Sequence, residues 1–153
     1  MDKSKTALLI IDYQVVDFNR TEVLHNSEDL KNNIKSLVTR ARKKNIPIFL
    51  TKHNGKLGSP SQKGLPGWSI HPSLELEGDE IIIEKNYPDS FQQTNLEAEL
   101  KLRAVNHLVM LGLKQKYVST QLVVKHLVKD LLLLLLKMVI AHMTVKILLQ
   151  SIL

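Results

Sequence analysis

Two charged residues follow two short apolar runs that we expect to be buried strands. Asp12 comes directly after the run Ala7 to Ile11, and Lys85 comes directly after the sequence EIIIE, residues 80–84. Open α/β sheets build their sites at the carboxyl ends of parallel strands, so both side chains are expected at one site. A carboxylate there can accept or donate a proton, and an ammonium group can stabilise negative charge. On position alone, Asp12 is explained equally well as the exit of the strand to solvent.

A second group of candidate residues lies in a long irregular segment, residues 52–79. Glycines and prolines punctuate this segment, which carries His53, Trp68 and His71. A structureless loop of this length in a compact domain is usually functional. Trp68 is interpreted equally well as a packing anchor for the loop and as the wall of a pocket, and both can hold.

The elements that must position these residues follow from hydrophobic periodicity. A helix is expected to begin at Ser27, with apolar residues on one face, and strands are expected at residues 46–50, 80–84 and 105–111. Helices that alternate with buried strands indicate an α/β fold. We therefore predict a three-layer α/β/α domain with a mostly parallel central sheet, an interior first strand and Asp12 at its carboxyl edge.

Composition excludes several classes of protein. The 153 residues are 44% hydrophobic and 24% charged, which is typical of a single globular domain, and the chain has no cysteine. Disulfides and thiolate metal sites are therefore excluded, and a cytoplasmic location is expected. We expect no signal peptide, because the first apolar run is short and ends in Asp12, and no membrane span, because charged residues bracket the longest leucine run, residues 131–136.

The positive charge is concentrated in the last third of the chain. Residues 1–100 hold 13 Lys and Arg against 14 Asp and Glu, whereas residues 101–153 hold 8 against 1. These lysines are dispersed among leucines without interleaved aromatic residues, so a solvated helix face is favoured over a nucleic-acid site. No nucleic-acid or membrane partner is expected.

Four segments in order resemble the isochorismatase-like family, which includes cysteine hydrolases such as nicotinamidase. They are IDYQVVDF, KHNGKLGSPSQKGLPGWSIHPSL, IIIEKNYPDSFQQTNLEAEL and VNHLVMLGLKQKY, and the match runs from Thr6 to about Tyr117. The resemblance implies the isochorismatase-like, Rossmann-like fold. It also implies a triad of Asp12, Lys85 and a cysteine, in which the thiolate is the nucleophile.

The sequence departs from the family where the nucleophile should stand. The family pattern Gly-x-x-Thr-x-x-Cys-Val places Val118 at the cysteine position, and Leu113–Lys114 at the cis peptide that borders the oxyanion site. A valine side chain cannot act as a nucleophile, so the thiol mechanism cannot operate on this sequence. After Gly112 the chain has no further glycine or proline and contains six consecutive leucines. We therefore expect one domain over residues 1–153 that is truncated or aberrant after about residue 113.

The resemblance also implies a substrate pocket and its occupant. The pocket residues expected from it are Gln14, His53, Trp68, His71 and Tyr117. No cofactor is expected. No metal is expected either, because His53 is the one histidine in its part of the sequence, and a single histidine is not a metal site. The resemblance implies a small-molecule substrate and a homo-oligomer.

Three functions stay open at this point. The first is hydrolysis of a small-molecule amide or related metabolite, and the second is hydrolysis of a vinyl ether by the acid alone, without a cysteine. The third is a non-catalytic family member that keeps the fold for ligand binding or assembly.

Overall fold

The computed structural model describes residues 5–19 and 27–112, which all lie within one compact unit, Met1–Val118. The expected departure after Gly112 and the second unit, Ser119–Leu153, lie outside the described residues. The elements in chain order are β1 (Thr6–Ile11), α1 (Val15–Phe18), α2 (Ser27–Lys43), β2 (Ile48–His53), η1 (Pro66–Trp68), η2 (Pro72–Leu74), β3 (Ile81–Lys85), α3 (Leu96–Leu102) and β4 (His107–Gly112).

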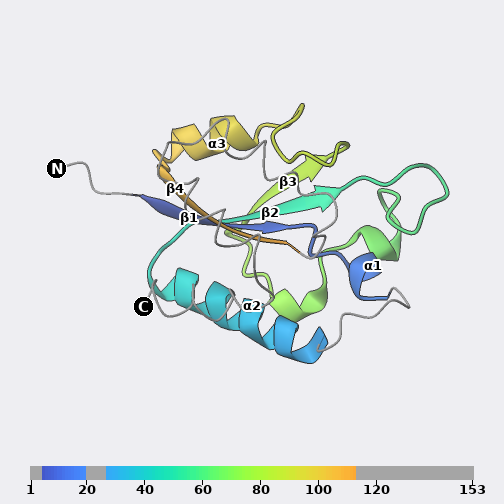
Figure 1. Cartoon of the computed structure of the whole chain (residues 1–153), viewed down its shortest axis with the longest axis horizontal. Helices are drawn as coiled ribbons and strands as arrows, with labels where there is room; N and C mark the ends of the chain where they lie inside the picture. The colour runs from blue at the N-terminus through green and yellow to red at the C-terminus, as the bar shows by residue number, and fades with distance from the viewer. Residues whose placement is uncertain (1–4, 20–26, 113–153) are drawn as a thin grey trace, which may run out of the picture. The chain divides into compact units, whose positions relative to one another are not determined.

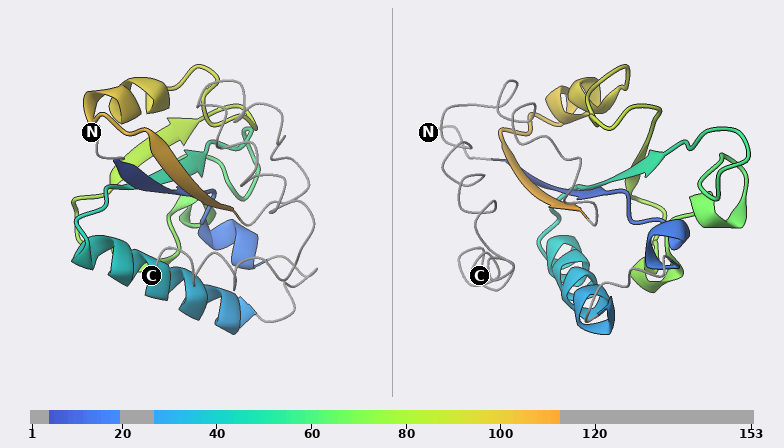
Figure 2. Two further views of the ribbon diagram at one scale, coloured as in Figure 1. Left: turned by 60° about the vertical axis from the view of Figure 1, so that its left-hand side comes forward. Right: turned by 45° about the vertical axis from the view of Figure 1, so that its right-hand side comes forward.

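The four strands form one parallel sheet in the order β3-β2-β1-β4. Helix α2 covers one face of this sheet and α3 covers the other, as the views in Figure 1 and Figure 2 show. The predicted three-layer α/β fold is confirmed, and β1 is an interior strand with Asp12 directly after it. Because all four strands run the same way, their carboxyl ends share one edge of the sheet.

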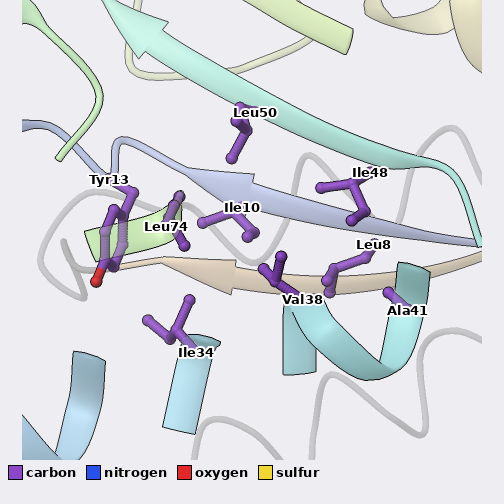
Figure 3. Close-up of a cluster of buried hydrophobic side chains, with 9 residues drawn as sticks. All are labelled: Leu8, Ile10, Tyr13, Ile34, Val38, Ala41, Ile48, Leu50 and Leu74. Atoms are coloured by element: carbon purple, nitrogen blue, oxygen red, sulfur yellow. The ribbon is translucent and has the colours of Figure 1, made fainter. Parts of the chain in front are cut away.

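The core under α2 follows from the sequence periods of both elements. Alternate residues of β1 and β2 face this helix, and residues three and four apart on α2 meet them. The nine clustered side chains, drawn in Figure 3, are Leu8, Ile10, Tyr13, Ile34, Val38, Ala41, Ile48, Leu50 and Leu74. Burying a large aliphatic side chain contributes about 1.5–3 kcal/mol, so this cluster fixes α2 and η2 on the sheet.

The predicted strand at residues 46–50 is displaced: β2 begins at Ile48 and continues to His53. After α2 ends at Lys43, Asn45 takes a left-handed conformation, and the N–H of Ile46 donates to the carbonyl of Ala41, so the chain is not yet extended there. At the other end, backbone pairing with β3 continues through the polar residues as far as the His53–Lys85 pair. The change from apolar to polar side chains after Leu50 is therefore not the end of β2.

The predicted strands at residues 80–84 and 105–111 are also displaced, by one and two residues at their starts. Lys85 is the last residue of β3 rather than the residue after it, and β4 is His107–Gly112. Among the described residues, no helix is long and apolar enough to cross a membrane.

Candidate active site

The position of Asp12 is set by β1 and by an unusual backbone conformation. Strand β1 is buried along almost its whole length, and Asp12 follows it with a φ of 54°, in the left-handed region. The Asp12 N–H donates to both the carbonyl and the hydroxyl of Thr51, at 3.2 Å each. The Thr51 hydroxyl in turn donates to Oδ1 of Asp12 at 3.1 Å. The end of β1 is thus joined to β2 through a single residue.

Lys85 reaches Asp12 from the last position of β3. In parallel strands, directly paired residues face the same side, so the pairs Thr51–Ile83 and His53–Lys85 place Lys85 on the same face as Thr51. Lys85 Nζ lies 3.1 Å from Oδ2 of Asp12 and donates to the carbonyl of Pro88 at 2.9 Å. The expected contact between the two charged residues is present.

The two charged side chains are almost completely removed from solvent. The side chain of Lys85 is 1% exposed and that of Asp12 is 7% exposed. Each charge is stable in this setting because the other neutralises it and because Thr51 and Pro88 supply further hydrogen bonds. The result is a fixed, oriented carboxylate–ammonium pair, an arrangement able to take up a proton and to stabilise a developing negative charge.

Gln14, which follows β1, is hydrogen-bonded to the end of β2 and to η1. Its side-chain amide donates to the carbonyls of His53 and Trp68 at 3.1 and 2.9 Å, and its Oε1 accepts from the His53 N–H at 2.8 Å. Gln14 is fully buried, so these partners replace water. The structure therefore gives Gln14 a bridging position beside the ion pair, and its contact with a substrate stays a prediction.

Trp68 is linked to the pair through one intervening residue. Its indole Nε1 donates to Oδ1 of Asn54 at 2.8 Å, and the Asn54 N–H donates to the carbonyl of Lys85, also at 2.8 Å. Lys52 Nζ lies 3.1 Å from the centroid of the indole ring, a cation–π contact. Burial lowers the pKa of Lys52, and the charge of Lys63 acts in the same direction. These contacts anchor Trp68, and its place on a pocket wall stays a prediction.

His71 belongs to a different set of contacts. Its ring packs on the rings of Tyr13 and Phe18, and its Nδ1 lies 2.8 Å from the hydroxyl of Ser73. Burial, assisted by the nearby charge of Lys31, lowers the pKa of His71. In the described part of the chain, His71 shares no hydrogen bond or ion pair with Asp12 or Lys85. The His71 N–H donates to the carbonyl of Tyr13, the residue after Asp12, at 2.9 Å, and the place of His71 on a pocket wall stays a prediction.

The remaining predicted site residues lie outside the described residues. They are Leu113, Lys114, Tyr117 and Val118. Within residues 5–19 and 27–112, no group of three or more His, Cys, Asp or Glu is arranged to hold a metal ion.

Sequence reasoning missed Thr51 and the Pro88 carbonyl. Thr51 carried a usable signal, because it directly follows the apolar run that we assigned to the second strand and therefore stands near the same sheet edge as Asp12. The Pro88 carbonyl carried none, since any residue offers one.

Comparison with known proteins finds relatives of this chain. A family model described as an isochorismatase domain matches residues 6–141. An uncharacterized isochorismatase family protein, YddQ of Bacillus subtilis, is 32% identical over 111 residues, which are 71% of this chain and 62% of that protein. Nicotinamidase 3 of Arabidopsis thaliana is 27% identical over 122 residues, covering 69% of this chain and 58% of that protein.

One solved structure has a similar fold. An isochorismatase from Pseudomonas putida KT2440 superposes with a TM-score of 0.65 at 30% identity, covering 71% of this chain and 56% of the other. The chain therefore spans less than two thirds of the length of each of these three proteins.

Proposed function

This chain belongs to the isochorismatase family, and from that membership we propose that it hydrolyses a small-molecule amide, with Asp12 as the proton acceptor and Lys85 as the neighbouring cation. The observation that carries the proposal is the buried pair, with 3.1 Å between Lys85 Nζ and Oδ2 of Asp12. The resemblance to a protein named a nicotinamidase supports an amide as the substrate class.

The partners of Asp12 favour a base over an acid. Its two carboxylate oxygens face the Lys85 ammonium and the Thr51 hydroxyl, both of which are donors. An ionised carboxylate accepts from both groups, whereas an O–H on Oδ2 would face the Lys85 ammonium, which can only donate. Amide hydrolysis begins with proton removal from the nucleophile, while hydrolysis of a vinyl ether begins with protonation of the substrate. The contacts therefore support the amide reaction.

Water is the nucleophile that we assign to this chain, since the sequence has no cysteine. In the proposed reaction, water adds to the amide carbonyl carbon while Asp12 takes its proton. Lys85 stabilises the negative charge that develops on the oxygen. The C–N bond then breaks, Asp12 returns the proton to the leaving nitrogen, and the products are a carboxylic acid and an amine or ammonia.

The test is release of ammonia from nicotinamide and a panel of simple primary amides by the full 153-residue protein. We expect turnover that iodoacetamide leaves unchanged and that both Asp12→Asn and Lys85→Met abolish. Asp79→Asn, at an exposed carboxylate, is the matched control and should keep full activity. Turnover that survives Asp12→Asn would remove Asp12 from the mechanism and overturn the proposal.

A non-catalytic role is the second candidate, and the missing cysteine is the observation that favours it. A protein that only binds amides would show a ligand-dependent rise in melting temperature without product. Ammonia release that depends on Asp12 excludes this alternative.

A further inference from the structure

Thr51 places a hydroxyl group in an otherwise apolar part of the sheet. It follows Ile48, Phe49 and Leu50 in β2 and, like Phe49 and Leu50, is completely buried. A buried hydroxyl is unfavourable unless it is hydrogen-bonded. Within the described part of the chain, the hydroxyl bonds to one residue: it accepts from the Asp12 N–H at 3.2 Å and donates to Oδ1 of Asp12 at 3.1 Å.

The hydrogen bond from the Asp12 N–H does not by itself explain why a hydroxyl group is needed at residue 51. The Asp12 N–H also donates to the Thr51 carbonyl at 3.2 Å, so this donor would keep a partner if the hydroxyl were absent. The bond to Oδ1 has no such substitute among the contacts of the described residues. What the hydroxyl adds is therefore the orientation of the carboxylate.

The backbone conformation of Asp12 restricts the directions in which its carboxylate can point. A residue other than glycine is strained in the left-handed region, where Asp12 lies with a φ of 54°. The Thr51 hydroxyl contacts both the main chain and the carboxylate of Asp12, so it fixes the side-chain torsions relative to this unusual backbone. With Oδ1 held by Thr51, the other oxygen, Oδ2, faces Lys85.

We propose that Thr51 is a positioning residue that aims the Asp12 carboxylate at Lys85. The link from this geometry to turnover rests on the proposed function, but the geometry itself does not. Among the described residues, Thr51 engages Oδ1 and Lys85 engages Oδ2, and each carboxylate oxygen has a second lone pair that can accept from a water molecule or a substrate. Thr51 thereby sets the direction from which Asp12 can accept a proton.

Two substitutions separate the hydroxyl from the shape of the side chain. Thr51→Val keeps the branched shape and removes the hydroxyl, whereas Thr51→Ser keeps the hydroxyl and removes the methyl group. Thr39→Val is the matched control, because the Thr39 hydroxyl is exposed and donates to the Lys35 carbonyl within α2, far from Asp12 in the sequence.

The first experiment is a crystal structure of each Thr51 variant, which requires no activity. In Thr51→Val we expect the Asp12 carboxylate to rotate and its nearest oxygen to lie beyond about 4 Å from Lys85 Nζ, the limit for an ion pair. In Thr51→Ser we expect the pair unchanged. An unchanged pair in Thr51→Val, or a broken pair in Thr51→Ser, overturns the proposal. If Thr51→Val does not fold, Thr51→Ala takes its place: we again expect the nearest Asp12 oxygen beyond about 4 Å from Lys85 Nζ, and an unchanged pair overturns the proposal.

The second experiment measures kcat and KM separately on the best amide substrate. For Thr51→Val we expect kcat to fall about 100-fold, as for a misplacement of about 1 Å, with KM within about threefold. Thr51→Ser should restore kcat, and Thr39→Val should not change it. Full kcat in Thr51→Val overturns the catalytic part of the proposal. If no variant and no wild-type protein releases ammonia, the proposed function fails, while the crystal structures still decide the positioning.

Discussion

Lys85 and Asp12 depend on each other for their stability in the core, because both side chains are almost unexposed. Removing one partner of a buried pair leaves an uncompensated charge, which costs about 3–5 kcal/mol. We therefore expect Lys85→Met alone to lower the free energy of unfolding by about that amount. The double variant Asp12→Asn/Lys85→Met should lose less than the sum of the two single variants, as measured by urea unfolding.

The surface pair of Lys101 and Glu97 is the control for this prediction. Its side chains are 75% and 45% exposed, and an exposed pair of this spacing is worth about 0.3–0.5 kcal/mol. Additive effects of Asp12→Asn and Lys85→Met would show that the two charges are not coupled in solution.

His71 makes stability depend on pH. Its Nδ1 accepts from the N–H of Ser73 at 3.2 Å, which requires an unprotonated nitrogen. Burial lowers the pKa of His71; the charge of Lys31 assists, while that of Glu28 opposes. Between this lowered pKa and the ordinary value of about 6.5, the unfolded chain binds the extra proton, so stability falls as the pH falls through that window.

The measurement is the midpoint of urea unfolding from pH 7.5 to 5.5. We expect His71→Asn to flatten the fall below about pH 6.5, because asparagine offers a similar acceptor that does not titrate in that range. An unchanged slope in His71→Asn would show that another group is responsible.

Residue chemistry made part of the site predictable. A carboxylate and an ammonium group at the ends of predicted strands indicate a sheet edge, and parallel pairing places the carboxyl ends of the strands at one edge, which is why Asp12 and Lys85 meet as expected. The Pro88 carbonyl was beyond sequence reasoning, because the path of the loop after β3 decides which backbone oxygen reaches Lys85.

At the scale of elements, the segment between β2 and β3 depends on close backbone approach. A Cβ atom at Gly67 would lie 2.3 Å from the Pro60 carbonyl oxygen, closer than atoms can pack. We expect Gly67→Ala to displace η1 and open the preceding loop, with faster tryptic cleavage at Lys56 and Lys63 under native conditions.

Gly78→Ala is the control for that experiment. Gly78 has a φ of 93° with open space around its Cβ position, so alanine there costs about 1–2 kcal/mol of local backbone strain without touching the loop. Equal cleavage rates at Lys56 and Lys63 in the two variants would contradict the role assigned to Gly67.

Across the whole molecule, the alternation of apolar runs and amphipathic helices sufficed for the layers and for the parallel sheet. Helix α2 was predictable because its buried residues, including Ile34, Val38 and Ala41, recur at helical spacing. The boundaries of β2 were not, because backbone pairing with β3 continues to His53 through side chains that are no longer apolar. The parallel topology predicts which strand ends lie together. It does not predict which atoms are in contact, because these contacts depend on loop paths that no periodic sequence pattern encodes.

The stacking of Lys52 on Trp68 has a practical consequence. Trp68 is the single tryptophan of the chain, so the tryptophan fluorescence of the protein comes from this one indole ring. That ring contacts the Lys52 ammonium on its face and Asn54 at its edge, and Asn54 is bonded to the backbone of Lys85. Any ligand that disturbs this chain of contacts changes the surroundings of the indole. The protein thus carries an intrinsic fluorophore next to its candidate active site, and titration of intrinsic fluorescence can report occupancy without a label.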